Sequence, residues 1–260
     1  MWVACLWVGS GWAASDAFPD AATAYLVKAG DTVLWEKSAH TRLPPASLTK
    51  ILTVSMALEQ ADLQTLVTVS TAAAAETGSK LGLRAGDQLR VADLLAAALL
   101  GSANDACHAL ADHVAGNEAR FVALMNKRVK ELGLRDTHFT NACGHDHVRH
   151  YSSVYDLAQL AELALRNPVF AAIVAQPDLK ISLANRARSF QLQNGNALIG
   201  RFRGVAGVKT GYTRRAGKCL IALAQRGTTR VLLLMLNAPN RWWDADEILH
   251  RAFAHVEHAS

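Results

Sequence analysis

The chain has 260 residues, of which 51% are apolar, and it carries a formal net charge of +5. This length and apolar content are sufficient for one large domain or two small ones with a sizeable core. The sequence has no lysine- or arginine-rich block, and no aromatic residues interleave with basic ones. Nucleic-acid binding therefore has no support, whereas the mild positive charge is compatible with an anionic substrate.

Residues 1–15, "MWVACLWVGSGWAAS", are typical of a signal peptide. A short apolar stretch is followed by small residues that suit signal peptidase, with cleavage after Ala13 or Ser15. Because no basic segment precedes the apolar stretch, the segment is either a truncated signal peptide or a loose tail. No later stretch is long and apolar enough to span a bilayer. We expect an exported protein of the periplasm or cell envelope, soluble or peripheral, with no transmembrane segment in the mature chain.

The first half of the chain begins with strand patterns and continues as helices. "TAYLVKAG" and "TVLWEKS" alternate around a Gly-Asp pair, which predicts a β-hairpin. Apolar positions over residues 46–60 repeat at helical spacing, with Pro44 and Pro45 just outside the start. Residues 77–90 are glycine-rich and loop-like. Further helices are expected over 91–104, 105–116, 118–132, 154–166 and 168–175, the first two hinged at Gly101 and Ser102.

After residue 178 the pattern changes to strands. Residues 204–211, 217–227 and 229–239 predict three strands in succession. A terminal helix over 241–256 carries an apolar stripe, and its polar face has Asp and Glu in place of a lysine cluster. Packing on the core is therefore favoured over a membrane-surface anchor. The stripe consists of Ala245, Leu249, Ala252, Phe253 and Val256.

Strand patterns at both ends of the chain enclose a helical middle. This order predicts an α+β fold, in which an antiparallel sheet from both chain ends is flanked by helices and carries an inserted helical subdomain. We expect the sheet parts at about 20–65 and 180–260 and the helical part at about 66–179. All of them belong to one domain, residues 16–260.

Three cysteines remain once residues 1–15 are removed: Cys107, Cys143 and Cys219. Their number is odd and none has Cys-x-x-Cys spacing, so neither a disulfide framework nor a zinc site is indicated. We expect these cysteines to be small buried apolar residues.

Ser47 and Lys50 stand three residues apart in "PPASLTK". On a helix this spacing places both side chains on one face, where the amine can take the hydroxyl proton. A lysine does this only when it is neutral, which requires burial or a second cation nearby. Because such a pair also occurs by chance, the motif alone leaves the structural and the catalytic readings about equal.

Two further motifs favour the catalytic reading. "GSAN" supplies Ser102 and Asn104 at the expected hinge between two helices, although these residues could instead merely cap the second helix. "VKTGYT" supplies Lys209, Thr210 and Gly211 on an expected strand, where glycine lets a ligand backbone lie close. Lys209 is the second cation that would keep Lys50 neutral. Together the three motifs predict a nucleophile site at Ser47.

With these motifs, "AHTRLPPASLTK", "ELGLRDTHFTN", "YSSVYDLAQLAELA" and "GVKTGYTRRAGKCLIALA" resemble the D-alanyl-D-alanine carboxypeptidase family. Its members are low-molecular-mass serine penicillin-binding proteins of the β-lactamase-like superfamily, and the resemblance runs from about residue 20 to 257. It implies a serine-type carboxypeptidase that removes the terminal D-alanine from peptidoglycan stem pentapeptides through an acyl-enzyme. It also implies acylation by β-lactams as covalent inhibitors, and neither a cofactor nor a metal is expected.

The resemblance also implies a role for each matching position. Ser47 attacks the carbonyl carbon, Lys50 takes its proton, Ser102 relays a proton to the leaving amine, and Asn104 orients the substrate and Lys50. The substrate-binding positions are Lys209, Thr210, Gly211, Tyr212 and Arg241. Of these, Lys209, Thr210 and Arg241 meet the substrate carboxylate, while the N–H groups of Ser47 and Tyr212 form the oxyanion hole.

The segment from residue 138 to 150 departs from the family pattern because it is rich in histidine. It contains His138, His145, His147 and His150, with no helical i, i+4 pair and no cysteine partner to support a metal site. We expect a solvated loop or the rim of a cleft. Arg214 and Arg215 are consistent either with a preference for anionic peptides or with a solvated turn.

Three other activities use related motifs. A DD-endopeptidase that cuts peptidoglycan cross-links is the main alternative. A class A β-lactamase needs a deacylating glutamate, but Glu162 in "ELALRN" is one residue out of pattern and reads as helix surface. A β-lactam receptor without turnover is the third. Relatives often add a β-rich second domain, and we expect none here, since the chain stops soon after its terminal helix.

Overall fold

The computed structural model describes residues 17–259, and the expected signal peptide lies outside these residues. The elements, in chain order, are β1 (Ala24–Ala29), β2 (Thr32–Lys37), the 3₁₀ helix η1 (Ala46–Thr49), α1 (Lys50–Gln60), β3 (Leu66–Thr68), α2 (Thr71–Ala74), β4 (Gln88–Arg90), α3 (Val91–Leu99), α4 (Asn104–Ala115), α5 (Glu118–Glu131), α6 (Val154–Leu165), α7 (Pro168–Val174), β5 (Asp178–Ser182), β6 (Ser189–Gln193), β7 (Val205–Thr213), β8 (Gly217–Arg226), β9 (Thr229–Leu236) and α8 (Arg241–Ala259).

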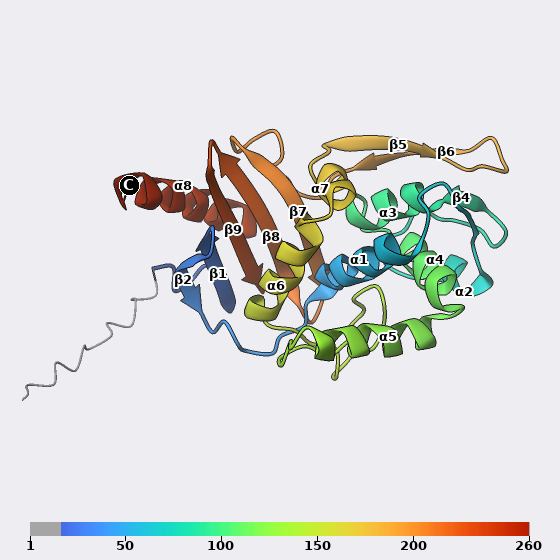
Figure 1. Cartoon of the computed structure of the whole chain (residues 1–260), viewed down its shortest axis with the longest axis horizontal. Coiled ribbons are helices and arrows are strands. Elements are labelled where there is room, and N and C mark those ends of the chain that lie inside the picture. Colours follow the sequence, from blue (N-terminus) through green and yellow to red (C-terminus); the bar gives the residue numbers. More distant parts are fainter. Residues whose placement is uncertain (1–16, 260) are drawn as a thin grey trace, which may run out of the picture.

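The main sheet joins the two ends of the chain. Its strand order is β2-β1-β9-β8-β7, and every neighbouring pair is antiparallel. In Figure 1 this sheet occupies one end of the molecule, and the helices α1 to α5 lie beyond β7 at the other end. The predicted α+β fold with an antiparallel sheet from both chain ends is confirmed. Strand β7 is the edge strand that faces the helices.

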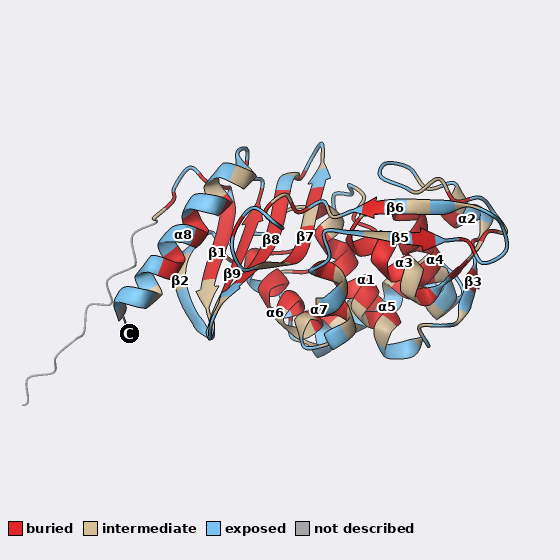
Figure 2. Cartoon of the chain, turned by 90° about the horizontal axis from the view of Figure 1, so that it is seen from above, coloured by how far each residue is buried: buried red, intermediate tan, exposed pale blue. Residues whose placement is uncertain are grey.

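The strands β1, β8 and β9 are buried on both faces of the sheet, whose successive side chains point to opposite sides. Along β9, Leu232 and Leu234 face the main core with α1 and α6, whereas Leu233 and Met235 face α8. Figure 2 shows buried residues through the strands and along one stripe of α8. Phe253 is 1% exposed, and its burial stabilises the fold by about 2–3 kcal/mol. The predicted packing of the terminal helix on the core is confirmed.

Sequence patterns missed two small antiparallel pairs. β3 pairs with β4, which lies in the segment expected to be a loop, and β5 pairs with β6 in a separate hairpin. β3 and β4 have three residues each, too few for a period of two to be recognised. The predicted helix over residues 46–60 also proves to be two elements, η1 followed by α1.

All three cysteines are buried, as expected, but the expectation that no disulfide forms was wrong for two of them. Cys107 on α4 and Cys143 form a disulfide across 36 residues of sequence, with 5.9 Å between their Cα atoms. The folded chain, rather than sequence spacing, brings α4 beside the loop that contains Cys143. Cys219 is free and buried, as expected.

Within residues 17–259, no single helix has the length and apolar character needed to cross a membrane. The helices α6 and α7 meet that requirement only as a pair, and the pair is bent by 107°.

Candidate active site

The proposed nucleophile lies on a tight turn rather than on a regular α-helix. Ser47 is partly exposed, whereas its neighbours Ala46, Leu48 and Thr49 are buried. In a 3₁₀ helix the side chains at positions i and i+3 eclipse each other. This geometry sets the Lys50 Nζ atom 3.0 Å from the Ser47 Oγ atom. The junction between η1, which contains Ser47, and α1, which begins at Lys50, therefore brings the two groups into contact.

Three oxygen atoms surround the amine of Lys50. Besides Ser47 Oγ, they are Asn104 Oδ1 at 2.7 Å and the carbonyl oxygen of Cys143 at 2.6 Å. The last two only accept hydrogen bonds. A neutral amine has two N–H groups, which satisfy these two acceptors, and one lone pair, which remains for the hydroxyl proton of Ser47. These contacts fit a charged amine that donates to all three oxygens, and they also fit a neutral amine whose lone pair can take the hydroxyl proton of Ser47.

Electrostatics also favour the neutral form of Lys50. Its side chain is fully buried, and burial is the main cause that lowers its pKa well below the usual 10.5. The positive charge of Lys209 lowers the pKa further, while Glu76 and Asp105 act in the opposite direction. The expected effect of Lys209 on Lys50 is thus an electrostatic repulsion that lowers the pKa of Lys50.

The GSAN motif lies between α3 and α4. Ser102 has a positive φ of 56° and is partly exposed, and Asn104 is the first residue of α4. The Asn104 amide donates to the carbonyl oxygen of Thr77 at 2.6 Å, which leaves its own oxygen to face Lys50. Buried Asp105 accepts backbone N–H bonds from residues 81–83 and so holds that loop against α4.

The VKTG motif lies on β7, directly beside η1 (Ala46–Thr49), which carries Ser47 and is called the nucleophile turn below. A Cβ atom at Gly211 would lie 3.1 Å from the backbone nitrogen of Ser47 and 3.2 Å from the carbonyl oxygen of Pro45. Glycine thus permits close contact between β7 and η1, a reason that differs from the predicted approach of a ligand. Lys209 is buried, and its Nζ atom donates to the carbonyl oxygen of Thr210 at 3.0 Å. Burial, with a smaller effect of Arg241, lowers the pKa of Lys209 to about 7.

Tyr212 and Arg241 flank this part of β7. Tyr212 is 65% exposed, so its side chain is available to a ligand. Arg241 begins α8, and its Nη1 atom donates to the carbonyl oxygens of Gly211 at 2.9 Å and Cys219 at 3.1 Å. Arg241 therefore ties β7 and β8 together, in addition to carrying positive charge near Lys209.

The sequence analysis did not predict that the loop containing Cys143 and Gly144 packs against the backbone of Ser47. Gly144 has a φ of 92°, and a Cβ atom there would overlap the carbonyl oxygen of Ala46 and lie 2.9 Å from the Ser47 nitrogen. The positive φ and the close backbone together require glycine at this position. The preceding residue, Cys143, provides a carbonyl oxygen for Lys50. A backbone acceptor has no signature in the sequence, since every residue has one.

His150 is not the solvated residue expected of the histidine-rich segment. It is 2% exposed, and its Nδ1 atom accepts from the N–H of Thr140 at 3.0 Å. Its proton therefore lies on Nε2, which is 2.8 Å from Thr49 Oγ1, and the Thr49 hydroxyl donates to the carbonyl oxygen of Ala46 at 2.8 Å. Burial, with the charges of nearby histidines, lowers the pKa of His150 to about 3. This chain of bonds supports the nucleophile turn.

Glu162 lies on α6, and its carboxylate forms an ion pair with Arg230 of β9 at 2.7 Å. Its expected place on the helix surface agrees with this contact. Nothing in its surroundings brings it to Ser47.

Comparison with known proteins identifies the family. The family model described as D-alanyl-D-alanine carboxypeptidase matches residues 13–240. The carboxypeptidase DacF of Bacillus subtilis is 37% identical over 211 residues, and DacC of Escherichia coli is 36% identical over 247 residues. These alignments cover 79% and 88% of this chain but 54% and 60% of the relatives, so the chain spans little more than half of their length. The chain belongs to the D-alanyl-D-alanine carboxypeptidase family.

Solved structures show the same fold. A D-alanyl-D-alanine carboxypeptidase from Mycobacterium tuberculosis superimposes with a TM-score of 0.83 at 31% identity, covering 90% of this chain and 91% of the other. A DD-transpeptidase from Streptomyces gives a TM-score of 0.83 at 31% identity, covering 90% of this chain and 97% of the other. The two names differ in the group that accepts the acyl chain, which is water for a carboxypeptidase and an amine for a transpeptidase.

Proposed function

We propose that residues 16–260 form the catalytic domain of an exported cell-envelope enzyme that removes the terminal D-alanine from peptidoglycan stem pentapeptides. The observation that carries this proposal is the Ser47–Lys50 pair, with its 3.0 Å separation and an amine whose other two neighbours only accept hydrogen bonds. Family membership supports the choice of substrate.

The acylation step follows from these contacts. The Ser47 oxygen forms a bond to the carbonyl carbon of the penultimate D-alanine, and the hydroxyl proton moves to Lys50. The N–H groups of Ser47 and Tyr212 stabilise the oxyanion, which develops only in the transition state. Collapse of the tetrahedral intermediate breaks the C–N bond, and Ser102 relays a proton to the departing amine. The contact between Gly211 and the Ser47 turn supports this use of the edge of β7.

Lys209, Thr210 and Arg241 form the proposed site for the substrate carboxylate. Lys209 in the middle of β7 and Arg241 at the start of α8 contribute positive charge, and Thr210 contributes a partly exposed hydroxyl. Gly211 allows the strand to approach the nucleophile. Asn104 holds Lys50 through its side-chain oxygen, and we assign the second N–H group of its amide to the substrate. Water then attacks the ester, which releases the shortened peptide and restores the Ser47 hydroxyl.

The experiment offers the purified protein three substrates: a pentapeptide ending in D-Ala-D-Ala, a cross-linked muropeptide and a chromogenic cephalosporin. We expect D-alanine release from the pentapeptide and a stable penicillin adduct by mass spectrometry. Ser47→Ala should abolish both. Ser55→Ala is the matched control, because Ser55 lies on α1 and its hydroxyl donates to the carbonyl oxygen of Ile51 at 2.7 Å.

Each alternative activity gives a different result in the same experiment. Cleavage of the cross-link without D-alanine release indicates a DD-endopeptidase, and rapid cephalosporin turnover indicates a β-lactamase. A stoichiometric adduct without any peptide product indicates a receptor. Addition of an amino acid acceptor tests transpeptidation, the activity named for the Streptomyces relative. Any of these outcomes without D-alanine release contradicts the proposal.

A further inference from the structure

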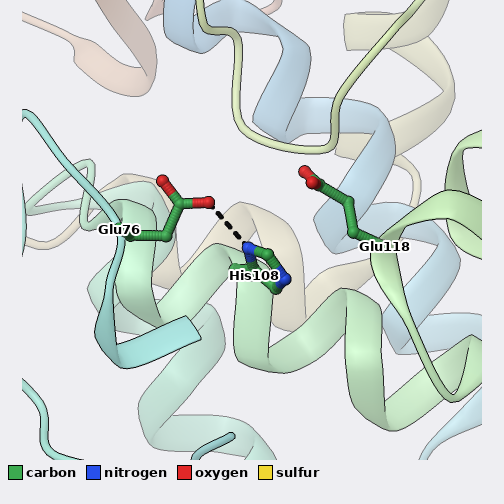
Figure 3. A group of neighbouring side chains, drawn as sticks. All are labelled: Glu76, His108 and Glu118. Atoms are coloured by element: carbon green, nitrogen blue, oxygen red, sulfur yellow. Dashed lines mark hydrogen bonds and ion pairs between the residues drawn. The ribbon is translucent and has the colours of Figure 1, made fainter. Parts of the chain in front are cut away.

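A second group of chemically reactive side chains lies next to the Lys50 pocket and has no part in the proposed mechanism. It contains Glu76, His108 and Glu118, whose potential ligand atoms all lie within 4.8 Å of one another. Figure 3 shows the carboxylates of Glu76 and Glu118 on either side of His108. Glu76 follows α2, His108 is on α4 and Glu118 starts α5. Segments far apart in sequence therefore converge here.

A fourth donor completes the group. The Nε2 atom of His145 lies 2.7 Å from one carboxylate oxygen of Glu76, and the Nδ1 atom of His108 lies 2.6 Å from the other. The side chains of Glu76 and His108 are 10% and 11% exposed, whereas His145 is 34% exposed. The cluster is thus nearly closed to water, and His145 provides its opening to solvent.

Other atoms of His108 and Glu118 are held by neighbouring polar groups, as the ligands of metal sites usually are. The Nε2 atom of His108 faces Asp112 Oδ1 at 3.4 Å, and Asp112 Oδ2 accepts from the hydroxyl of Ser70 at 2.6 Å. A carboxylate on the far nitrogen of a histidine is the common arrangement behind a metal-binding imidazole. Glu118 is fixed in the same way, since one of its oxygens accepts the N–H of Ala142 at 2.9 Å.

The charges of the cluster also favour the binding of a cation. Three carboxylates, those of Glu76, Asp112 and Glu118, lie beside two imidazoles, those of His108 and His145. Over residues 17–259, none of the three carboxylates forms an ion pair with lysine or arginine, and the histidines pair with Glu76 and Asp112. A divalent ion can replace the protons shared between the histidines and the carboxylates, because metal binding requires deprotonated ligands.

We propose that Glu76, His108, Glu118 and His145 form a binding site for a divalent transition-metal ion of the zinc type. Two imidazole nitrogens and two carboxylates suit zinc, whereas calcium and magnesium prefer ligands that are all oxygen. Tetrahedral zinc ligands lie about 3.3 Å apart, given bond lengths of about 2.0–2.1 Å. The ligand atoms of Glu76, His108 and Glu118 lie within 4.8 Å of one another, so binding of an ion would require these side chains to rotate closer together.

The site would connect the segments that hold Lys50. Thr77, which follows Glu76, accepts from the Asn104 amide. Asn104 lies one turn before His108 on α4. Cys143 and Gly144, which contact Lys50 and the Ser47 turn, directly precede His145. A bound ion would therefore fix the three segments around the base without contacting it.

The test is zinc binding to the full chain, produced without a histidine tag and stripped of metal by a chelator. Calorimetric titration with zinc chloride, and metal content after dialysis, should give one ion per chain and a raised melting temperature. His108→Asn should weaken zinc binding at least tenfold. His147→Asn is the matched control, since His147 is exposed in the same segment as His145 and should leave binding unchanged.

Two results would overturn the proposal. One is the absence of zinc binding to the unaltered chain at micromolar concentrations. The other is equal affinity of the unaltered chain and of His108→Asn, which would assign the ion to another place. Because His108 is partly buried, circular dichroism must show that His108→Asn is folded; Glu118→Gln and His145→Asn test the same site if it is not. Cobalt, which gives visible absorption bands when bound by imidazole and carboxylate, provides a readout independent of enzyme activity.

Discussion

The Lys50 Nζ atom lies 2.6 Å from the carbonyl oxygen of Cys143, whose sulfur is bonded to that of Cys107. Cys107 lies three residues after Asn104 on α4, and Asn104 provides the other acceptor for Lys50. The two acceptors of the Lys50 amine therefore belong to segments that are joined covalently. The disulfide fixes the distance between the helix and the loop, and with it the pocket that holds the amine.

Removal of the disulfide should lower both stability and acylation. For a double Cys107→Ala, Cys143→Ala variant, the chain-entropy model predicts a loss of about 3–4 kcal/mol in the free energy of unfolding. Acylation by a fluorescent penicillin should slow, because the Cys143 carbonyl is no longer held beside Lys50. Denaturant unfolding and labelling rates measure the two effects. Cys219→Ala is the control, since Cys219 is free; equal labelling rates in all three proteins would contradict the role of the disulfide.

Gly144→Ala should damage the nucleophile turn. The added methyl group would overlap the carbonyl oxygen of Ala46, so the turn or the loop must move. We expect a loss of about 2–4 kcal/mol in stability, as for overpacking combined with strain at a positive φ, and at least a hundredfold slower acylation. Gly86→Ala is a close control, because Gly86 has a φ of 86° but no atom within 4 Å of an added Cβ. If both variants were equally active, contact with the turn would be unimportant.

The pH dependence of kcat/KM should be bell-shaped. Lys50 must be neutral, so activity rises as the pH increases through its lowered pKa. Lys209 must be charged to bind a carboxylate, so activity falls as the pH rises through about 7, the pKa of Lys209 in the free protein. Lys209→Arg should move the alkaline limb upward by more than one pH unit, since a guanidinium stays charged. An alkaline limb that stays near pH 7 in this variant would assign it to another group.

His150 should make the fold sensitive to acid. Its pKa is lowered to about 3 in the folded protein and is near 6.5 when unfolded, so below pH 6.5 the unfolded chain binds a proton that the folded chain does not. The stability that His150 provides is present above pH 6.5 and is lost progressively as the pH falls toward 3. Between pH 6.5 and 5 the loss is about 2 kcal/mol, at 1.36 kcal/mol per pH unit.

Comparison with His150→Gln isolates this effect from those of the other histidines. A glutamine amide can accept from the N–H of Thr140 and donate to Thr49 without titrating. Urea unfolding of both proteins at pH 5 and 7 should show a smaller change for the variant, by about 2 kcal/mol. Equal changes in the two proteins would mean that His150 does not control the acid sensitivity.

Local patterns in the sequence determined the α+β fold, the strands at both chain ends and the packing of the terminal helix. These features depend on the alternation of apolar residues, which neighbouring positions set by themselves. The motifs around Ser47, Asn104 and Lys209 were equally visible, because each occupies a few consecutive residues. The sequence also showed that Lys50 needs burial or a second cation to become neutral, since a lone amine in water keeps its proton at neutral pH.

Only the tertiary structure decided how the pKa of Lys50 is lowered and how Ser47 is supported. The acceptors of the amine include the Cys143 carbonyl, and the turn is held by Gly144 from one side and by His150 through Thr49. The disulfide and the Glu76–His108 cluster likewise join segments distant in sequence. Such contacts leave no periodic signal, because they depend on the distance between backbones in space. Burial, the main cause of the lowered pKa of Lys50, exists only once the chain has folded.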